Sequence, residues 1–101
     1  MADITLEKLP PQNLEAEMAV LGSMLMDEDA ISSATELLDQ DSFYKDTHKK
    51  IFEAICNLYN ANKAVDLITL TDELKRNQAL EAIGGVSFLT ELVNSVPTAA
   101  N

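Results

Sequence analysis

The sequence predicts an all-α protein that folds as a single compact, irregular bundle of about five to six helices. Apolar residues recur at spacings of three and four along most of the chain, which is the period of one helix face. Of the 101 residues, 47% are hydrophobic, 3 are Gly and 3 are Pro, so there is apolar surface for one core and few helix breakers. No window alternates polar and apolar residues long enough to predict a strand, and 64–69 is only a weak candidate.

The first predicted helix runs from about Leu14 to Met26. Two prolines stop any helix before it, and Asn13 is the predicted N-cap because its side chain can accept a hydrogen bond from a free N–H of the next turn. One stripe of this helix faces the core: Leu14, Met18, Leu21 and Leu25. Gly22 and Ser23 are weak helix formers within it, and we expect their small size to let another helix approach closely.

A second helix follows the acidic run 27–29, with Asp29 as its predicted N-cap. Its apolar residues are Ile31, Ala34, Leu37 and Leu38. The first two helices should therefore form a hairpin or a corner, and the polar segment 39–42 leads to the next helix.

The third helix has the clearest amphipathic pattern. Phe43 and Tyr44 are predicted to form a hydrophobic staple before it, and Asp46 or Thr47 is the predicted cap. Its core side carries His48, Ile51, Phe52, Ile55, Leu58 and Tyr59. The polar residues 60–63 suit its C-terminal end.

Thr69 to Asp72 resembles a capping box and predicts the start of a fourth helix, with Asp66 as the rival cap and an end near Asn77. Leu80 and Ile83 belong to a short helical turn that stops at Gly84 and Gly85. A last helical stripe consists of Phe88, Leu89, Leu92 and Val93, and Pro97 is predicted to end it.

The charge balance argues against a main role in gripping nucleic acid. Seven Lys and Arg stand against seventeen Asp and Glu, a net charge of -10 that repels phosphates. The acidic residues either only keep the protein soluble or form a face that binds a basic partner. Cys56 is the one cysteine and is predicted to be a buried thiol in a reducing compartment. No basic segment followed by an apolar one opens the chain, so we expect a cytoplasmic protein with no membrane association.

No constellation predicts catalysis or the binding of a cofactor or metal. The glycines lack the spacing and the following lysine of a phosphate loop, which favours a helix stop at Gly84 and Gly85. His48 and Cys56 would lie ~12 Å apart along a helix, too far to share a metal. We expect His48 to be a half-buried core residue bonded to a backbone or carboxylate oxygen. A helix-turn-helix that reads DNA is disfavoured because the candidate recognition helix, 88–93, contains no Arg or Lys.

Six segments occur in register along the chain. They are Pro10 to Glu17, Val20 to Ser23, Phe43-Tyr44 with His48 and Ile51-Phe52, Val65-Asp66 with Thr69, Gly84-Gly85 with Leu89, and Val96 to Asn101. Together they closely resemble the N-terminal domain of the DnaB-family replicative DNA helicases. The resemblance runs from about Leu9 to the last residue.

This resemblance implies that the chain is a fragment of a longer protein. In the family, a C-terminal RecA-like domain binds ATP and Mg, encircles single-stranded DNA as a hexamer and translocates 5′ to 3′. The N-terminal domains form a collar on which the primase C-terminal domain docks, and a helicase loader is a further possible partner. The expected division is a flexible tail at 1–9, the helical collar domain at 10–97, and at 98–101 the start of the connection to a helical hairpin and the ATPase domain.

The fragment itself is therefore expected to be an interaction domain and not an enzyme. We expect Asn13, Gly22, His48, Gly84 and Gly85 to have structural roles. In the family the hairpin supplies much of the contact between copies, so the fragment alone should be monomeric or weakly dimeric. Without the hairpin, part of the contact surface between copies is left uncovered. We expect the border of that surface to include the exposed edge of the helix near Val86 and the residues Val96, Pro97, Thr98 and Asn101. The alternative function is a small helical domain that contacts DNA directly.

Overall fold

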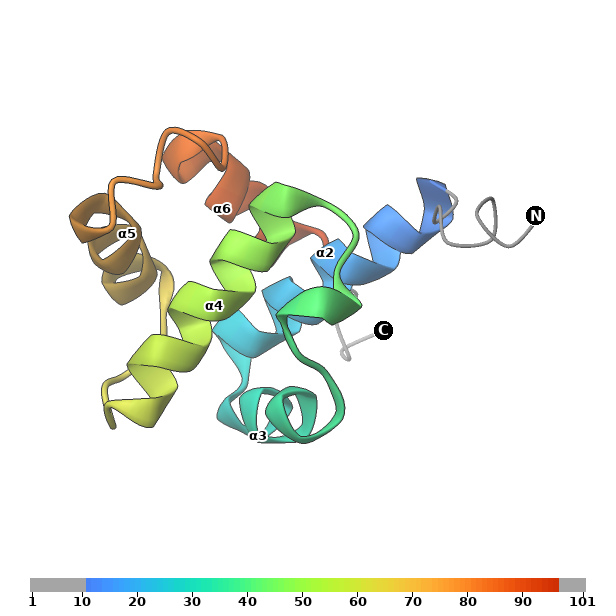
Figure 1. Ribbon diagram of the computed structural model, residues 1–101, viewed down its shortest axis with the longest axis horizontal. Helices are drawn as coiled ribbons and strands as arrows, with labels where there is room; N and C mark the ends of the chain where they lie inside the picture. The colour runs from blue at the N-terminus through green and yellow to red at the C-terminus, as the bar shows by residue number, and fades with distance from the viewer. Residues whose placement is uncertain (1–10, 97–101) are drawn as a thin grey trace.

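The computed structural model describes residues 11–96, and their side chains from Leu14 onward. Within this range the chain forms five α-helices and one 3-10 turn: α2 (Pro11–Met26), α3 (Glu28–Leu37), η1 (Gln40–Ser42), α4 (Asp46–Asn60), α5 (Leu67–Arg76) and α6 (Gly85–Asn94). The described residues include no strand, which confirms the all-α prediction. Figure 1 shows α4 crossing the middle of the bundle with α2 behind it, α3 at one end and α5 and α6 on the other side.

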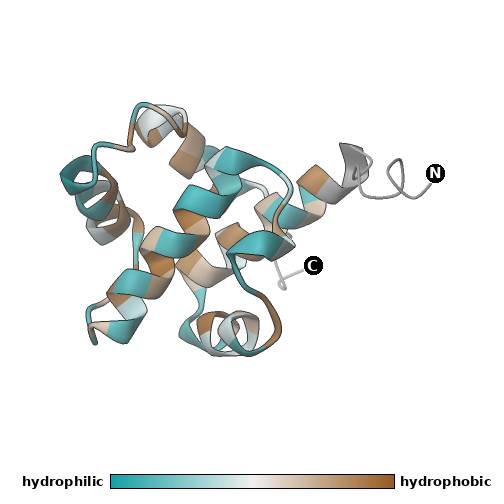
Figure 2. Cartoon of the chain, in the orientation of Figure 1, coloured by the Kyte–Doolittle hydropathy of each residue, from teal (hydrophilic) through white to brown (hydrophobic). Residues whose placement is uncertain are grey.

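The two central helices organise the packing. α2 packs against α3, α4 and α6, whereas α4 also contacts α5 and η1. Their inner faces carry the hydrophobic residues, as the brown patches between the helices show in Figure 2. All five helices contribute fully buried apolar side chains, which are Leu21, Met24, Ile31, Ile51, Ile55, Leu70, Leu74, Leu89 and Leu92. One core therefore joins segments from both ends of the described chain.

The first two predicted caps are wrong. α2 begins at Pro11, so Asn13 lies inside the helix and is not its N-cap. Proline suits the first helical position because its φ is fixed near the helical value and its missing N–H needs no partner there. The N-cap of α3 is Asp27, whose Oδ1 accepts a hydrogen bond from the N–H of Asp29 at 3.0 Å. Asp29 itself belongs to the first turn.

Leu37 is the one predicted core residue of α3 that faces solvent, with 80% of its surface exposed. Six residues separate it from Ile31, which turns it about 120° away from the buried stripe. Ile31 and Ala34 are buried, as predicted.

The start of α4 also differs from the prediction. Its N-cap is Lys45, which makes no side-chain capping bond, and Asp46 and Thr47 lie in the first turn. Phe43 is buried against Phe52, with ring centroids 4.9 Å apart, whereas Tyr44 is 46% exposed. The predicted core face of α4 is otherwise buried, with Tyr59 half-buried at its end.

The N-cap of α5, the fourth predicted helix, is Asp66, which was the alternative to Thr69. Asp66 Oδ1 accepts a hydrogen bond from the N–H of Thr69 at 2.8 Å, and Thr69 Oγ1 accepts one from the N–H of Asp66 at 2.9 Å. This reciprocal pair is a capping box that begins one turn before the predicted one. The end of α5 at Asn77 agrees with the prediction.

Three helical segments end in the same way. A residue just after the helix is left-handed, and its N–H and the N–H of the next residue donate hydrogen bonds to carbonyls in the last turn. The left-handed residues are Asn62 (φ 61°), Gln78 (φ 59°) and Gly84 (φ 107°). After α5, the N–H of Gln78 donates to Lys75 O at 3.0 Å and that of Ala79 to Leu74 O at 2.8 Å. This is the Schellman pattern, which satisfies carbonyls at a helix end.

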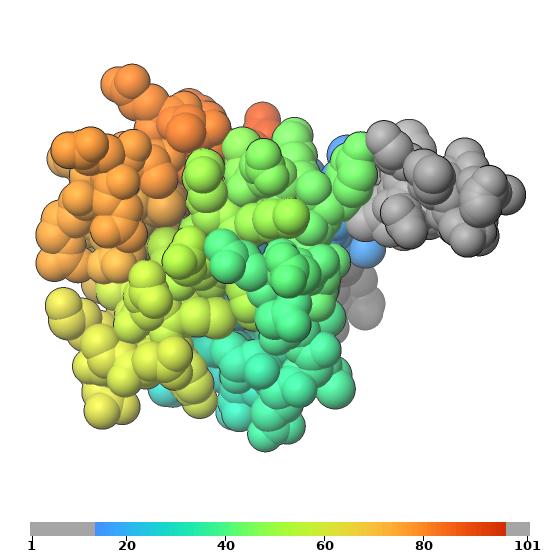
Figure 3. Space-filling model, in the orientation of Figure 1, coloured from blue at the N-terminus to red at the C-terminus, as the bar shows by residue number. Residues whose placement is uncertain are grey.

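Figure 3 shows the face over α4, on which side chains of η1, α4 and α5 form a continuous surface. No helix in residues 11–96 is long and apolar enough to span a bilayer.

Candidate protein-interaction surface

The contact between α2 and α6 is closest at Gly22. An added Cβ atom at this position would lie 2.5 Å from Val96 Cγ2 and nearer still to the carbonyl oxygen of Leu92. Real Cβ atoms do not approach backbone this closely, so α2 and α6 can take these positions only if residue 22 is glycine. The close approach places Val96, and with it the end of α6, directly against α2.

The outer edge of α6 is the part of the predicted interface border that the structure describes. Val86, in the first turn of α6, is 46% exposed, and Val96 is half-buried just after the helix. Pro97, Thr98 and Asn101 lie outside the described residues. The side chains that share the exposed edge are Val86, Ser87, Thr90, Glu91 and Asn94. This edge carries one carboxylate and no cation, which suits a protein contact better than a phosphate backbone.

A buried polar pair fixes the other side of α2. Glu17 and His48 are 7% and 1% exposed, and Glu17 Oε1 lies 2.7 Å from His48 Nδ1. Glu17 Oε2 accepts a hydrogen bond from the N–H of Tyr44 at 2.8 Å. The His48 ring also stacks on Phe88 of α6, with centroids 5.9 Å apart and an interplanar angle of 15°. One side-chain cluster therefore joins α2, α4 and α6.

Glu17 is a buried partner that the sequence did not reveal, and His48 is more deeply buried than predicted. Only the charge of Glu17 near the helix start is obvious from the sequence, yet Leu14, Glu17 and Leu21 share the spacing of three and four that defines the buried stripe. That periodicity was the available signal. His48 is fully buried rather than half-buried, and its Nε2 has no hydrogen-bond partner among the described residues. A carboxylate 31 residues away in sequence completes its surroundings.

The glycine pair stops one helical segment and starts another. The N–H of Gly84 donates to Glu81 O at 3.2 Å and that of Gly85 to Leu80 O at 2.9 Å, so the turn that contains buried Ile83 ends here. Gly84 and Gly85 have φ values of 107° and 75°, which L side chains rarely adopt. α6 begins at Gly85 immediately afterwards.

Cys56 and the metal-ligating side chain types of residues 11–96 were candidates for reactive chemistry, and the structure places them as follows. Cys56 is half-buried, not buried as predicted, and burial together with nearby Glu53 raises the pKa of its thiol. A raised pKa keeps the thiol protonated at neutral pH and makes it a poor nucleophile. Across the part of the chain that the structure describes, no three His, Cys, Asp or Glu side chains are placed to hold a metal ion.

Comparison with known proteins places the chain beside bacterial replicative helicases. The family model described as the DnaB-like helicase N terminal domain matches residues 9–101. Replicative DNA helicase DnaC of Bacillus subtilis is 48% identical over 101 residues, which is 100% of this chain and 22% of the relative. Replicative DNA helicase DnaB of Geobacillus stearothermophilus is 46% identical over the same shares.

A solved structure shows the same fold. The crystal structure of the N-terminal domain of DnaB helicase from Mycobacterium tuberculosis is similar with a TM-score of 0.84 and 43% sequence identity. The match covers 92% of this chain and 65% of that one. At this identity the likeness extends from the fold to the family.

Proposed function

This chain belongs to the family of DnaB-like helicase N-terminal domains, and on that premise we propose that it is an assembly and interaction module of a replicative DNA helicase, without catalysis of its own. The observation that carries the proposal is the match of residues 9–101 to the N-terminal domain alone. The acidic surface and the cation-free edge of α6 support a protein-binding role. The partners we propose are other copies of the helicase, the primase C-terminal domain and a helicase loader.

The activity of the longer protein is part of the same proposal. The chain spans 22% of the length of the two relatives from Bacillus subtilis and Geobacillus stearothermophilus, which are named as replicative DNA helicases. We propose that the rest of such a protein supplies an ATPase domain that uses ATP and Mg, assembles as a hexamer and translocates 5′ to 3′ on single-stranded DNA.

The assembly role is tied to the edge of α6. Because α6 packs against Gly22, its C-terminal end is fixed, and exposed Val86 and half-buried Val96 form the border of the proposed contact with another copy. On this account the chain alone lacks most of that contact. Sedimentation equilibrium should give a monomer or a weak dimer, whereas a tight hexamer of the chain alone would contradict the account.

A titration distinguishes the proposed module from a domain that contacts DNA. Fluorescence anisotropy of a labelled single-stranded oligonucleotide should change little when the chain is added at low or moderate salt, because its net charge of -10 repels phosphate. The primase C-terminal domain, labelled in the same way, should bind. Strong DNA binding that falls steeply with salt, with no binding of the primase domain, would favour the DNA-contacting alternative.

A further inference from the structure

A second surface, separate from the edge of α6, has the features of a binding site. A cavity of about 680 Å³ lies where α2 ends, α3 begins and the segment after α4 turns back. This volume falls in the range of ligand-binding pockets. Its apolar walls include buried Leu25 and Ile31 and half-buried Tyr59 and Val65.

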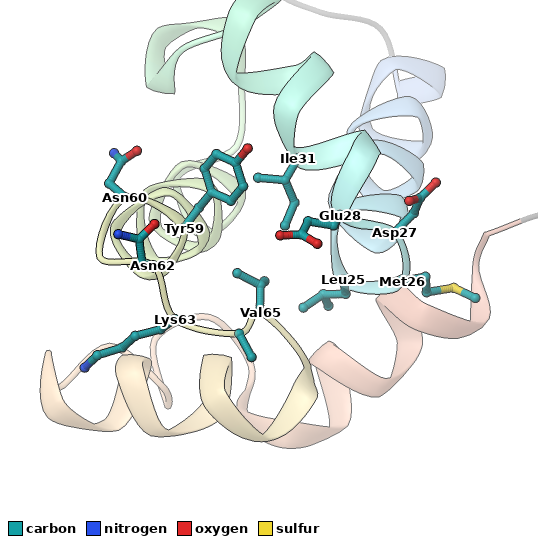
Figure 4. Close-up of a pocket in the computed structure, with 11 residues that line it drawn as sticks. Leu25, Met26, Asp27, Glu28, Ile31, Tyr59, Asn60, Asn62, Lys63 and Val65 are labelled. Atoms are coloured by element: carbon teal, nitrogen blue, oxygen red, sulfur yellow. The ribbon is translucent and has the colours of Figure 1, made fainter.

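One carboxylate reaches into this cavity. Figure 4 shows the side chain of Glu28 pointing into the space between Tyr59 and Val65, whereas the ammonium group of Lys63 points away. Among the described residues no cation lies within ion-pair distance of Glu28. Glu28 lies in the first turn of α3, where the partial positive charge of the helix start favours an acidic residue. This local effect does not explain why the Glu28 carboxylate points over the apolar wall of the cavity.

Three helix ends meet at the same place, and the partial charges of their backbones oppose one another. α2 ends at Met26 and α4 ends at Asn60, and both helix ends line the cavity. The C-terminal ends of α2 and α4 carry partial negative charge, and the N-terminal end of α3 at Glu28 carries partial positive charge, so the two carboxylates decide the sign. Asp27, the neighbour of Glu28, adds a second carboxylate at the rim. The cavity therefore favours a cation that also carries apolar surface.

We propose that this cavity binds an arginine side chain from a basic segment of a partner protein. The guanidinium would pair with Glu28 through two parallel hydrogen bonds and stack on the Tyr59 ring, and the arginine stem would cover Leu25. Arginine fits better than lysine because its planar guanidinium can pair with a carboxylate through two hydrogen bonds and also stack on an aromatic ring. The net charge of -10 attracts a basic partner and repels nucleic acid. This inference uses none of the residues at the edge of α6 and does not rest on the assembly role.

The test uses a pair of peptides that differ only in charge. Acetyl-Leu-Arg-Leu-amide and the same peptide with neutral citrulline are titrated into the ¹⁵N-labelled chain and followed by NMR. The arginine peptide should give saturable shifts at the amides of Leu25, Glu28 and Val65, and the citrulline peptide should bind about fivefold more weakly or less. Equal affinity for both peptides, or shifts spread over the acidic surface, would overturn the proposal.

Matched variants separate the cavity from general charge. Glu28→Gln should weaken binding of the arginine peptide about fivefold, whereas Glu36→Gln, an exposed carboxylate on the same helix that does not line the cavity, should leave it unchanged. Equal losses for the two variants would mean that only net charge attracts the peptide. Tyr59→Leu, which keeps apolar bulk but removes the ring, should also weaken binding, and unchanged affinity would contradict stacking.

Discussion

The junction of α2, α4 and α6 is stabilised by residues far apart in the sequence, whereas the two ends of α5 are stabilised by near neighbours along the chain. At the junction, Gly22 contacts Leu92 and Val96, and Glu17 meets His48. At α5, the capping box, the Schellman turn and the ion pair between Arg76 and Glu73 at 2.5 Å all join residues within a few positions. The difference indicates that changes at the junction should cost much more than changes around α5.

The largest effect is expected from Gly22→Leu. Leucine has the better helix propensity, but its Cβ would overlap the α6 backbone, so the free energy of unfolding should fall by about 3 kcal/mol. Chemical denaturation of the variant measures this loss. Ala16→Leu is the control, because Ala16 is exposed on the same helix and should tolerate leucine within about 0.5 kcal/mol. An unchanged or raised melting temperature for Gly22→Leu would refute the close contact.

Breaking the buried pair should come next. The two carboxylate oxygens of Glu17 contact His48 and the N–H of Tyr44. Glu17→Gln replaces one of these oxygens by an NH₂ group, so either His48 or the N–H of Tyr44 loses its acceptor. The free energy of unfolding should fall by about 2 kcal/mol. Glu15→Gln, on the exposed part of the same helix, is the matched control and should have little effect. Similar stability of the two variants in urea titrations would show that the buried pair adds nothing.

A smaller loss is expected at the start of α5. Asp66→Ala removes the side-chain half of the capping box and should lower stability by about 1 kcal/mol. Lys45→Ala tests the contrast, because Lys45 caps α4 without a side-chain bond and its truncation should be nearly neutral. Thermal unfolding followed by circular dichroism compares them, and equal losses would argue against the capping box.

The smallest expected effect is a gain at the end of α5. Gln78 holds a φ of 59°, and glycine adopts this conformation without a steric penalty, so Gln78→Gly should raise stability by about 0.5 kcal/mol. Gly84→Ala, at a φ of 107° with Phe88 Cβ 2.9 Å from the added atom, should have the opposite sign. Denaturation midpoints that move in the same direction for both variants would contradict this reading of the turns.

The same contrast explains what the sequence could predict. The α5 signals lie within a few residues of one another, so Asp66 was already recognised as a possible cap, and Asn77 marks the observed helix end. The cap at Asn13 was wrong because Pro11 opens the helix instead of stopping it, and the cap at Asp29 was wrong because local preference does not choose among three consecutive acidic residues. The partner of His48 lies 31 residues away and could not be identified from spacing.

The candidate surfaces show the same limit. The edge near Val86 was proposed from the resemblance, and the structure adds how much of it is exposed. The cavity beside Glu28 was not foreseen, because it forms where the ends of α2 and α4 meet and no single segment contains it. A site that is formed by elements distant in the sequence can be recognised only once the fold is known.

The most direct test of the central claim compares α6 with α5 in a helicase that carries this domain. Val86→Glu and Ile68→Glu make the same kind of change at two exposed residues, which are 46% and 80% exposed. If the edge of α6 borders the contact between copies, Val86→Glu should raise the hexamer dissociation concentration about tenfold in sedimentation experiments, and Ile68→Glu should leave it nearly unchanged. Equal effects, or a larger effect of Ile68→Glu, would contradict the account.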